Sequence, residues 1–548
     1  MTSISSVTAE TVTATELLQL AQGDAEHAVI DVREPYVQAH DGHILVSVPL
    51  PLGQIELRAV ELLPRRDVRI VVVDDDGGER ARRAAARLAV LGYTNVALLQ
   101  GGIAAWRAEG LPVYTGTGVY SKAFGEYVEH QKQTPHISAT ELWDKLQRKE
   151  DVIVLDGRTV EEFNRFSIPG AAPLPNAELP YRIHELLPSE QTLVVINCAG
   201  RTRSIIGAQG LINAGLSNPV AALEDGTMDW LFQRLPLEQG KARPLPVPGE
   251  ATREKAREAK RHLTAEYGIE WLDADALASL RAEASSQQAD RTVYWIDVRT
   301  RAEYEQGHLP GSQWAEGGQL VQGIDRHIGV RNATIVLIDD ADGTRAAITA
   351  SWLQQLRWGK VLAYAAAPEA LKETSVSGTA TAVPDLPAGK WLDVAELQGR
   401  LARDEVQLLD LAPSTVYASA HIPGARFAVR ERLLLGDEGQ GIHALDQRPL
   451  VLTSQDGRLA AWAAQELAAA GKREVRALRG GTTAWQAVGL PLEHGETQLL
   501  HSTDDVPRDS YAWPTEAERF AAFRAYLDWE RGLLPQVLSD PLARFAHA

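Results

Sequence analysis

The stretch T-L-V-V-I-N-C-A-G-R-T-R-S-I-I-G-A-Q, from Thr192 to Gln209, decides the fold. It opens with an apolar run, Leu193 to Ile196 followed by Asn197, that is typical of a buried strand and passes through a polar loop into a helical pattern. Cys198, the single cysteine of the chain, lies at that junction. A strand end, a tight loop and a helix start direct backbone N–H groups at one point, so the stretch predicts a cysteine in an anion-binding turn.

Two arginines, Arg201 and Arg203, follow Cys198 within five residues. Nearby cations and a helix N-terminus both favour thiolate over thiol, so we expect the Cys198 thiol to be more acidic than a free thiol. The alternative is that Cys198 is an inert, buried hydrophobic residue. The polar residues that follow it suit an anion better than a core, and we therefore favour the functional interpretation.

Composition places the chain among soluble multidomain proteins. With 548 residues, and about 150 residues per domain, three or four domains are expected. The apolar runs are strand-sized and far shorter than about 20 residues, so no membrane span is expected. The first residues lack a basic segment followed by an apolar one, which predicts a cytoplasmic protein.

Charge and cysteine content exclude several function classes. A single cysteine cannot form an intramolecular disulfide or a thiolate-rich zinc site. The net charge of −18, with no compensating basic stripe, argues against binding to nucleic acid. The histidines have no metal-ligand spacing, so we expect neither a metal nor another cofactor.

The chain contains four copies of one unit, each with two landmarks. The first landmark is an apolar strand that ends in an aspartate, at Asp31, Asp156, Asp297 and Asp410. The second is an apolar strand that enters a short loop and a helix, with the loops starting at Asp75, Cys198, Asp340 and Ser454. The two landmarks are 44, 42, 43 and 44 residues apart, which is too regular for chance.

Two further motifs recur in most copies. A glycine-containing turn before a tryptophan closes three of them, at Trp106, Trp230 and Trp485. A Pro-Gly turn lies between the landmarks as G-H-L-P-G-S after Gln306, A-H-I-P-G-A after Ser419 and, in shortened form, S-I-P-G-A after Phe166. Both motifs are turn signals at fixed offsets, which supports a repeated fold.

Strands that alternate with helical segments predict α/β domains, each a mainly parallel sheet with helices on both faces. Ligand sites in such sheets lie at the C-terminal ends of strands, where all four loops fall. Composition places linkers at Thr115–Pro135, Pro244–His262 and Val376–Pro387. The expected domains are residues 1–115, 135–243, 263–375 and 388–495, followed by a helical tail at 496–548.

Together these motifs resemble the rhodanese superfamily, and the chain resembles multidomain sulfurtransferases in which one repeat keeps the catalytic cysteine. The resemblance implies that Cys198 takes a sulfane sulfur from a small anionic donor, thiosulfate or a persulfide, and passes it to cyanide or a thiol. It also implies a cradle for the substrate formed by Ala199, Gly200, Arg201, Thr202, Arg203 and Ser204. We favour Arg201 for substrate binding and Arg203 for bracing the loop through a carboxylate.

The other residues of the repeated motifs are expected to support the fold or to leave their loops inactive. Asp156 and Arg158 are expected to form a buried ion pair that supports the first strand end. Asp75 and Asp340 would fill their own loops like permanent anions, so copies one and three are expected to be inert. Ser454 has no histidine in its loop to activate it, so copy four is also expected to be inactive.

Two other functions stay open at this level. The chain could be a sulfur-relay or regulatory protein in which the inert copies bind a protein acceptor. A cysteine-based phosphatase or arsenate reductase is disfavoured, because those relatives use a loop one residue longer to hold a tetrahedral oxyanion. The aromatic spacing of the tail, from Phe520 to Trp529, predicts an amphipathic helix that packs on the domains or on a second copy of the chain.

Overall fold

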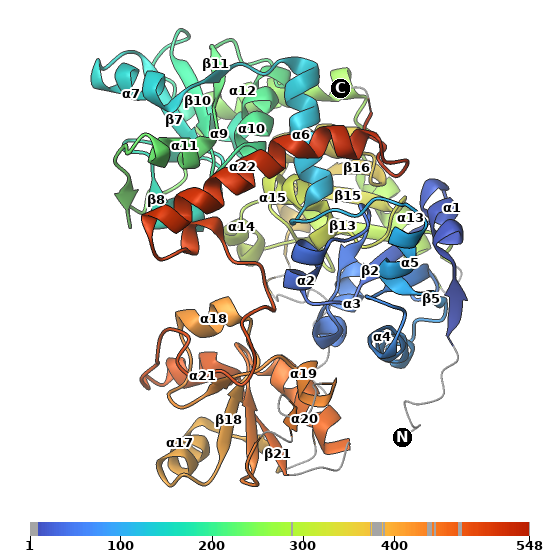
Figure 1. Ribbon diagram of the computed structural model, residues 1–548. Coiled ribbons are helices and arrows are strands. Elements are labelled where there is room, and N and C mark those ends of the chain that lie inside the picture. The colour runs from blue at the N-terminus through green and yellow to red at the C-terminus, as the bar shows by residue number, and fades with distance from the viewer. Residues whose placement is uncertain are drawn as a thin grey trace.

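The computed structural model describes residues 9–546 except 287–288, 373, 375–385, 387–388, 436–440, 443–444 and 470–473. Four α/β units follow one another along the chain, and a long C-terminal helix crosses the upper part of the molecule (Figure 1). The strand pairs within each unit's main sheet are all parallel. The predicted fold class is therefore confirmed.

The first two units share one plan. In copy one the strands are β1 (Glu10–Val12), β2 (His27–Asp31), β3 (Val48–Pro49), β4 (Arg69–Val73) and β5 (Val96–Leu99), and the helices are α1 (Ala14–Gln22), α2 (Pro35–Asp41), α3 (Ile55–Leu62), α4 (Glu79–Val90) and α5 (Gly102–Ala108). In copy two the strands are β6 (His136–Ile137), β7 (Val152–Asp156), β9 (Ala172–Pro173), β10 (Leu193–Asn197) and β11 (Val220–Leu223), and the helices are α7 (Ala139–Gln147), α8 (Val160–Arg165), α9 (Leu179–Arg182), α10 (Thr202–Asn213) and α11 (Gly226–Phe232). A short antiparallel pair, β8 (Phe166–Ser167) with β12 (Glu238–Gln239), lies beside the second sheet.

The last two units repeat the plan of the first two. In copy three the strands are β13 (Val293–Asp297), β14 (Gln313–Trp314), β15 (Thr334–Asp339) and β16 (Lys360–Ala365), and the helices are α13 (Ala274–Ala284), α14 (Arg301–Gln306), α15 (Gly317–Gln322) and α16 (Thr344–Leu356). In copy four the strands are β17 (Trp391–Leu392), β18 (Gln407–Asp410), β19 (Arg426–Phe427), β20 (Leu450–Thr453) and β21 (Val475–Leu478), and the helices are α17 (Val394–Ala402), α18 (Ser414–Ser419), α19 (Arg432–Leu435), α20 (Arg458–Ala469) and α21 (Gly481–Ala487).

The strand order is the same in every copy. Copies one, two and four read first, fifth, fourth, second, third across the sheet, as in β6-β11-β10-β7-β9. Copy three has the same order without the first strand, and a single parallel bridge from Trp271 to Ala363 stands in its place. The fourth strand is always central, so the loop that follows it emerges from the middle of the sheet.

Two of the sequence landmarks form side-chain contacts that recur in three of the four copies. The tryptophan indole N–H donates to a proline carbonyl six residues later, at 2.9, 2.8 and 2.9 Å, in the pairs Trp106–Pro112, Trp230–Pro236 and Trp485–Pro491. The landmark aspartate forms a buried salt bridge with an arginine two residues later, at 2.6, 2.8 and 2.6 Å, in the pairs Asp31–Arg33, Asp156–Arg158 and Asp297–Arg299. Copy four has Ala412 in place of that arginine, and only its backbone N–H bonds to Asp410.

Two of the expected linkers are helices. The segment expected as the first linker forms α6 (Val119–Lys132), and the second forms much of α12 (Glu250–Tyr267). Most residues of α6 are buried, because the helix packs between α10 and the C-terminal helix. The third expected linker, Val376–Pro387, lies outside the described residues apart from Leu386.

The tail forms the 23-residue helix α22 (Glu516–Leu538), which crosses α6 (Figure 1). Phe523 and Leu527 are buried against Met228 of copy two. The amphipathic helix expected from the aromatic spacing is thus present. These apolar side chains pack within the chain itself.

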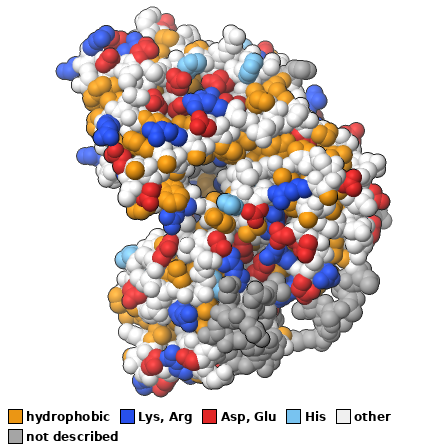
Figure 2. All heavy atoms as spheres, viewed as in Figure 1, with side chains coloured by type: hydrophobic (Ala, Val, Ile, Leu, Met, Phe, Trp, Pro, Cys, Tyr) orange, Lys and Arg blue, Asp and Glu red, His pale blue; other side chains and the backbone are white. Residues whose placement is uncertain are grey.

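The copies are joined in two different ways. Copies one and three share one continuous apolar core with α6, with apolar residues of α10 in copy two and with the end of α22. Copy four has separate cores and meets copy one through ion pairs, among them Arg430–Glu56 at 2.8 Å and Arg80–Glu431. On the face shown in Figure 2, acidic and basic side chains are mixed. Among the described residues, no helix is both long enough and apolar enough to cross a membrane.

Candidate active site

The Cys198 loop, residues 198–203, connects β10 to α10 in copy two. The carbonyl oxygens of Cys198 and Ala199 accept hydrogen bonds from the N–H groups of Thr227 and Met228, at 2.9 and 3.1 Å. Gly226, at φ 53°, lies so close to the carbonyl oxygens of Cys198 and Gly200 that a side chain would not fit. The carbonyls are therefore turned outward. No described residue accepts a hydrogen bond from the backbone N–H groups of residues 199–203, which leaves a cup of free donors.

The Cys198 thiol lies in this cup and is 2% exposed. Its sulfur is 3.6 Å from the hydroxyl oxygen of Ser204. Burial raises the pKa of Cys198, and this outweighs the lowering by the charge of Arg203 and by hydrogen bonds from Ser204. The expectation of an unusually acidic thiol is therefore wrong for this conformation, because the sequence could not show how completely the thiol is buried.

Arg203 braces the loop. Its guanidinium makes two hydrogen bonds to Glu162, at 2.7 and 2.9 Å, and its backbone carbonyl accepts one from Asn176 at 2.9 Å. Arg203 lowers the pKa of Glu162 to about 2 despite the burial of that carboxyl group. This is the bracing arrangement that the sequence analysis favoured for Arg203.

The guanidinium of Arg201 is paired with carboxylates of the protein itself. It bonds to Glu126 at 2.7 and 3.0 Å, to Asp225 at 3.0 Å, and to Glu129. Glu126 and Glu129 belong to α6, which the sequence analysis treated as a linker. The geometry therefore does not support the expected substrate-binding role for Arg201, because its charge is already balanced by three carboxylates.

Asp156 and Arg158 lie beneath the loop and are 0% and 1% exposed. Asp156 also accepts a hydrogen bond from the side chain of Asn197, at 2.9 Å. The Arg158 guanidinium donates to the carbonyl of Phe166 at 2.7 Å and lies over its ring. The pair joins the ends of two neighbouring strands, which is a supporting position.

The C-terminal tail covers the loop, and sequence reasoning missed these contacts. The Tyr511 hydroxyl donates to the carbonyl of Ala199 at 2.8 Å. The ring of Tyr526 lies against Gly200, where a Cβ atom would be 3.0 Å from its Cε1. The Thr202 hydroxyl donates to Glu530. The aromatic spacing of the tail predicted a packed helix, but no signal in the sequence indicated that it packs on Cys198.

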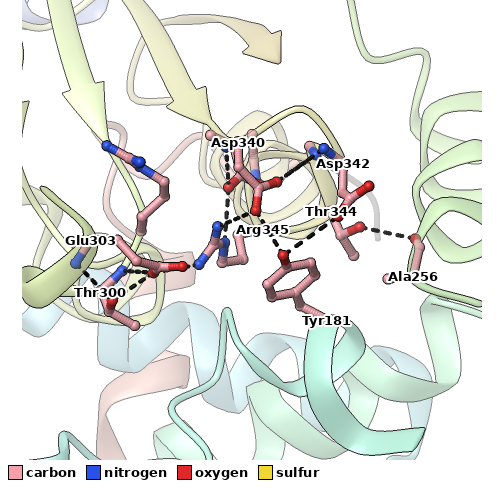
Figure 3. Close-up of polar contacts among 12 residues, drawn as sticks. Tyr181, Ala256, Thr300, Glu303, Asp340, Asp342, Thr344 and Arg345 are labelled. Carbon is pink, nitrogen blue, oxygen red and sulfur yellow. Dashed lines mark hydrogen bonds and ion pairs between the residues drawn. The ribbon is translucent and has the colours of Figure 1, made fainter. Parts of the chain in front are cut away.

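In copy three, Asp340 occupies the loop position of Cys198, and its carboxylate fills its own loop (Figure 3). One oxygen accepts from the N–H groups of Asp342 and Gly343, at 3.0 and 3.4 Å. The other bonds to Arg345 at 2.9 Å and to the hydroxyl of Tyr181 at 2.7 Å. Tyr181 belongs to copy two, so the third loop also joins two copies.

The loops of copies one and four differ from those of copies two and three. Asp75 points out of its loop, with a side chain that is 52% exposed and paired with Arg33 and Arg80. Asp74 accepts the loop N–H of Gly77 instead, at 2.6 Å. The Ser454 hydroxyl accepts only a backbone N–H, at 3.3 Å, and no described histidine or carboxylate bonds to it.

The family description Rhodanese-like domain matches four stretches of the sequence, residues 13–109, 138–233, 278–371 and 393–488. The chain belongs to the rhodanese family. The Cys198 loop lies in the second rhodanese domain, whereas α6 and α22 lie outside all four matches. Among the described residues, no group of three or more histidine, cysteine, aspartate and glutamate side chains could hold a metal ion.

Similar proteins include sulfurtransferases. A crystal structure of thiosulfate sulfurtransferase from Pseudomonas aeruginosa is 39% identical, has a TM-score of 0.90, and is matched over 98% of this chain and 99% of that one. A thiosulfate sulfurtransferase of Azotobacter vinelandii is 34% identical over 117 residues, which is 18% of this chain and 43% of that protein. A sulfurtransferase of Allochromatium vinosum is 35% identical over 104 residues, 19% of this chain and 94% of that protein.

Proposed function

We propose that this rhodanese-family protein is a sulfurtransferase that carries a sulfane sulfur on Cys198. The observation that carries the proposal is the cup of free N–H groups around Cys198. In the third domain the same cup is filled by the carboxylate of Asp340, so a cup of this shape accepts an anion. The second domain offers a thiol there and leaves the donors free.

The proposed reaction has two steps. The Cys198 thiolate attacks the outer sulfur of thiosulfate, the S–S bond breaks, and sulfite leaves with the bonding electron pair. Cyanide or a thiolate then attacks the outer sulfur of the Cys198 persulfide, which releases thiocyanate or a new persulfide and restores the thiolate. The N–H groups of residues 199–203 stabilise the negative charge on the sulfur in both steps.

A test measures transfer of sulfur from thiosulfate to cyanide, together with the mass of the intact protein after incubation with thiosulfate alone. The unmodified chain is expected to gain the mass of one sulfur atom and to form thiocyanate. Cys198→Ala is expected to lose both, because no other cysteine can carry the sulfur. Thiocyanate formation at the normal rate by Cys198→Ala would overturn the proposal.

A second experiment separates small-molecule catalysis from a sulfur relay. The protein is first loaded with thiosulfate, freed of excess donor and offered either cyanide or a thiol-containing protein as acceptor. We expect rapid transfer to cyanide. Transfer to the protein thiol alone would indicate a relay in place of the small-molecule reaction.

A further inference from the structure

Both arginines of the Cys198 loop are committed to carboxylates of the protein. Arg201 pairs with three of them and Arg203 with one in two-point geometry. Arginine held in this way has little remaining charge to offer a ligand. An anionic sulfur donor therefore needs another positive group close to Cys198.

Lys122 of α6 is a buried cation without a direct ion pair among the described residues, although the charge of Glu530 opposes the lowering of its pKa. The residue is 7% exposed and makes no salt bridge with any described residue. Its ammonium group lies 4.9 Å from the ring centre of Tyr526 and 4.7 Å from that of Trp529. Burial lowers the pKa of Lys122 to about 8, which still leaves it mostly protonated at neutral pH. A buried ammonium among neutral rings costs free energy that a neighbouring anion would recover.

The position of Lys122 places it beside the Cys198 loop. Gly125, nearly one turn further along α6, lies against Thr202, where a Cβ atom would be 2.7 Å from the Thr202 methyl carbon. The ring of Tyr526 contacts both Gly200 of the loop and the ammonium of Lys122. The charge of Arg203 lowers, and the charge of Glu530 raises, the pKa of both Lys122 and Cys198. The two groups therefore lie close to the same charged side chains.

The third domain shows how a similar lysine is satisfied when the loop has its own anions. Lys260 of α12 lies 3.9 Å from the ring centre of Trp271, and its ammonium is close to Gly343 of the third loop. The carboxylate of Asp339 at the end of β15, followed by those of Asp342 and Asp340 in that loop, opposes the lowering of its pKa by burial. The Cys198 loop has neutral Cys198 and Gly200 at those two positions, so the loop itself supplies no carboxylate to Lys122, and the carboxylates that raise the pKa of Lys122, Glu530 and Asp325, belong to other segments.

We propose that Lys122 binds the anionic group of the sulfur donor while the sulfane sulfur meets Cys198. The donor class is a small oxyanion whose negative group lies next to a sulfane sulfur, as in thiosulfate. This inference deepens the proposed function and rests on it. Lys122 would be a substrate-binding residue that the rhodanese domain itself does not supply, since α6 lies between the first two matched stretches.

The test compares alkylation of Cys198 by iodoacetate and by iodoacetamide in the full-length protein. Both reagents alkylate the thiolate by displacing iodide; iodoacetate adds a charged carboxymethyl group and iodoacetamide a neutral carbamidomethyl group of nearly the same size. The single cysteine makes the mass of the intact protein an unambiguous readout. Lys122→Met is expected to reduce the iodoacetate-to-iodoacetamide rate ratio by about tenfold, since a cation within contact distance favours only the charged reagent. Lys122→Arg is expected to keep most of the preference.

Lys260→Met is the matched control, because it removes a lysine stacked on a tryptophan in another domain, and its ratio is expected to stay unchanged. Equal changes of both rates in Lys122→Met, or no change in either, would show that Lys122 only anchors α22 and would overturn the proposal. If Lys122→Met fails to fold, as judged by its circular dichroism, Lys122→Gln serves with the same expected ratio. Alkylation needs no sulfur transfer, so this result is independent of the test of the proposed function.

Discussion

Glu530 is the side chain of the tail that bears most directly on the reactivity of Cys198. It is 0% exposed, and one of its oxygens accepts the hydroxyl of Thr202 in the Cys198 loop. Its negative charge adds to burial in raising the pKa of Cys198. A carboxylate in this place holds the resting thiol in its neutral form.

Replacement of Glu530 by glutamine is expected to lower the pKa of Cys198. Removal of a negative charge favours the thiolate, so at a pH below the thiol pKa the variant should react several times faster with iodoacetamide. Glutamine keeps an oxygen for the hydroxyl of Thr202. The measurement is the pH dependence of the iodoacetamide rate, whose midpoint should move to lower pH.

A control for this prediction is Glu518→Gln, at the exposed first turn of α22, which is expected to leave the midpoint in place. A midpoint that moves equally in both variants would mean that the shift reflects the helix as a whole. A midpoint that rises in Glu530→Gln would contradict the electrostatic explanation.

At the scale of secondary-structure elements, α22 packs over the Cys198 loop and α6 packs beside it, between α22 and α10. Phe523 and Leu527 hold α22 on Met228, two residues after the glycine that fixes the Cys198 loop. The cover leaves Cys198 only 2% exposed. Access to the thiol therefore depends on how firmly this helix is packed.

Phe523→Ala is expected to loosen α22 and to expose Cys198. Loss of a fully buried phenylalanine costs about 3 kcal/mol or more where the site cannot collapse, and here the cost falls on the contact between the tail and the second domain. The rate of reaction with neutral iodoacetamide should rise several-fold, as followed by the mass of the intact protein.

Leu538→Ala is the matched control on the same helix, because Leu538 is 55% exposed and its loss should change neither the rate nor the stability. An unchanged rate in Phe523→Ala, with a folded protein, would show that Cys198 is reached by a path that does not involve the tail.

At the scale of the whole molecule, the inert third loop joins domains two and three. Arg345 is fully buried and bonds to Asp340, Asp339 and Glu303 in its own domain and to Glu178 of the second domain. Asp340 also holds Tyr181 of the second domain (Figure 3). The third loop, which has an aspartate at the position of Cys198, is part of an interface between two domains.

Asp340→Ala is expected to lower the free energy of unfolding by about 2 kcal/mol, because Arg345 stays buried with one carboxylate fewer and the hydroxyl of Tyr181 loses its closer acceptor, which leaves only Asp342 at 3.5 Å. Asp75→Ala, at the same loop position in the first domain, should cost less than about 1 kcal/mol, since that side chain is 52% exposed. Urea unfolding followed by tryptophan fluorescence compares the two. Equal losses would contradict the interface role of Asp340.

Much of the fold was predictable because its signals are local in the sequence. The apolar strands, the aspartate–arginine pairs and the tryptophan–proline contacts each involve residues at most six positions apart. The repetition of the strands in four copies, and of each side-chain contact in three, made the assignment of the α/β units possible. The helix α6 was missed because its segment follows a glycine-rich turn and has a mixed polar sequence, so its burial depends on neighbours that are distant in the chain.

The sequence by itself determined that a lone cysteine follows a buried apolar strand of one α/β unit among four, with a turn that presents backbone N–H groups. The tertiary structure decided what surrounds that cysteine. Arg201 meets Glu126 across 75 residues, and Thr202 meets Glu530 across 328. The charge, burial and reactivity of Cys198 arise from such contacts, because electrostatic energy depends on distance in space and on solvent exposure, neither of which a residue pattern records.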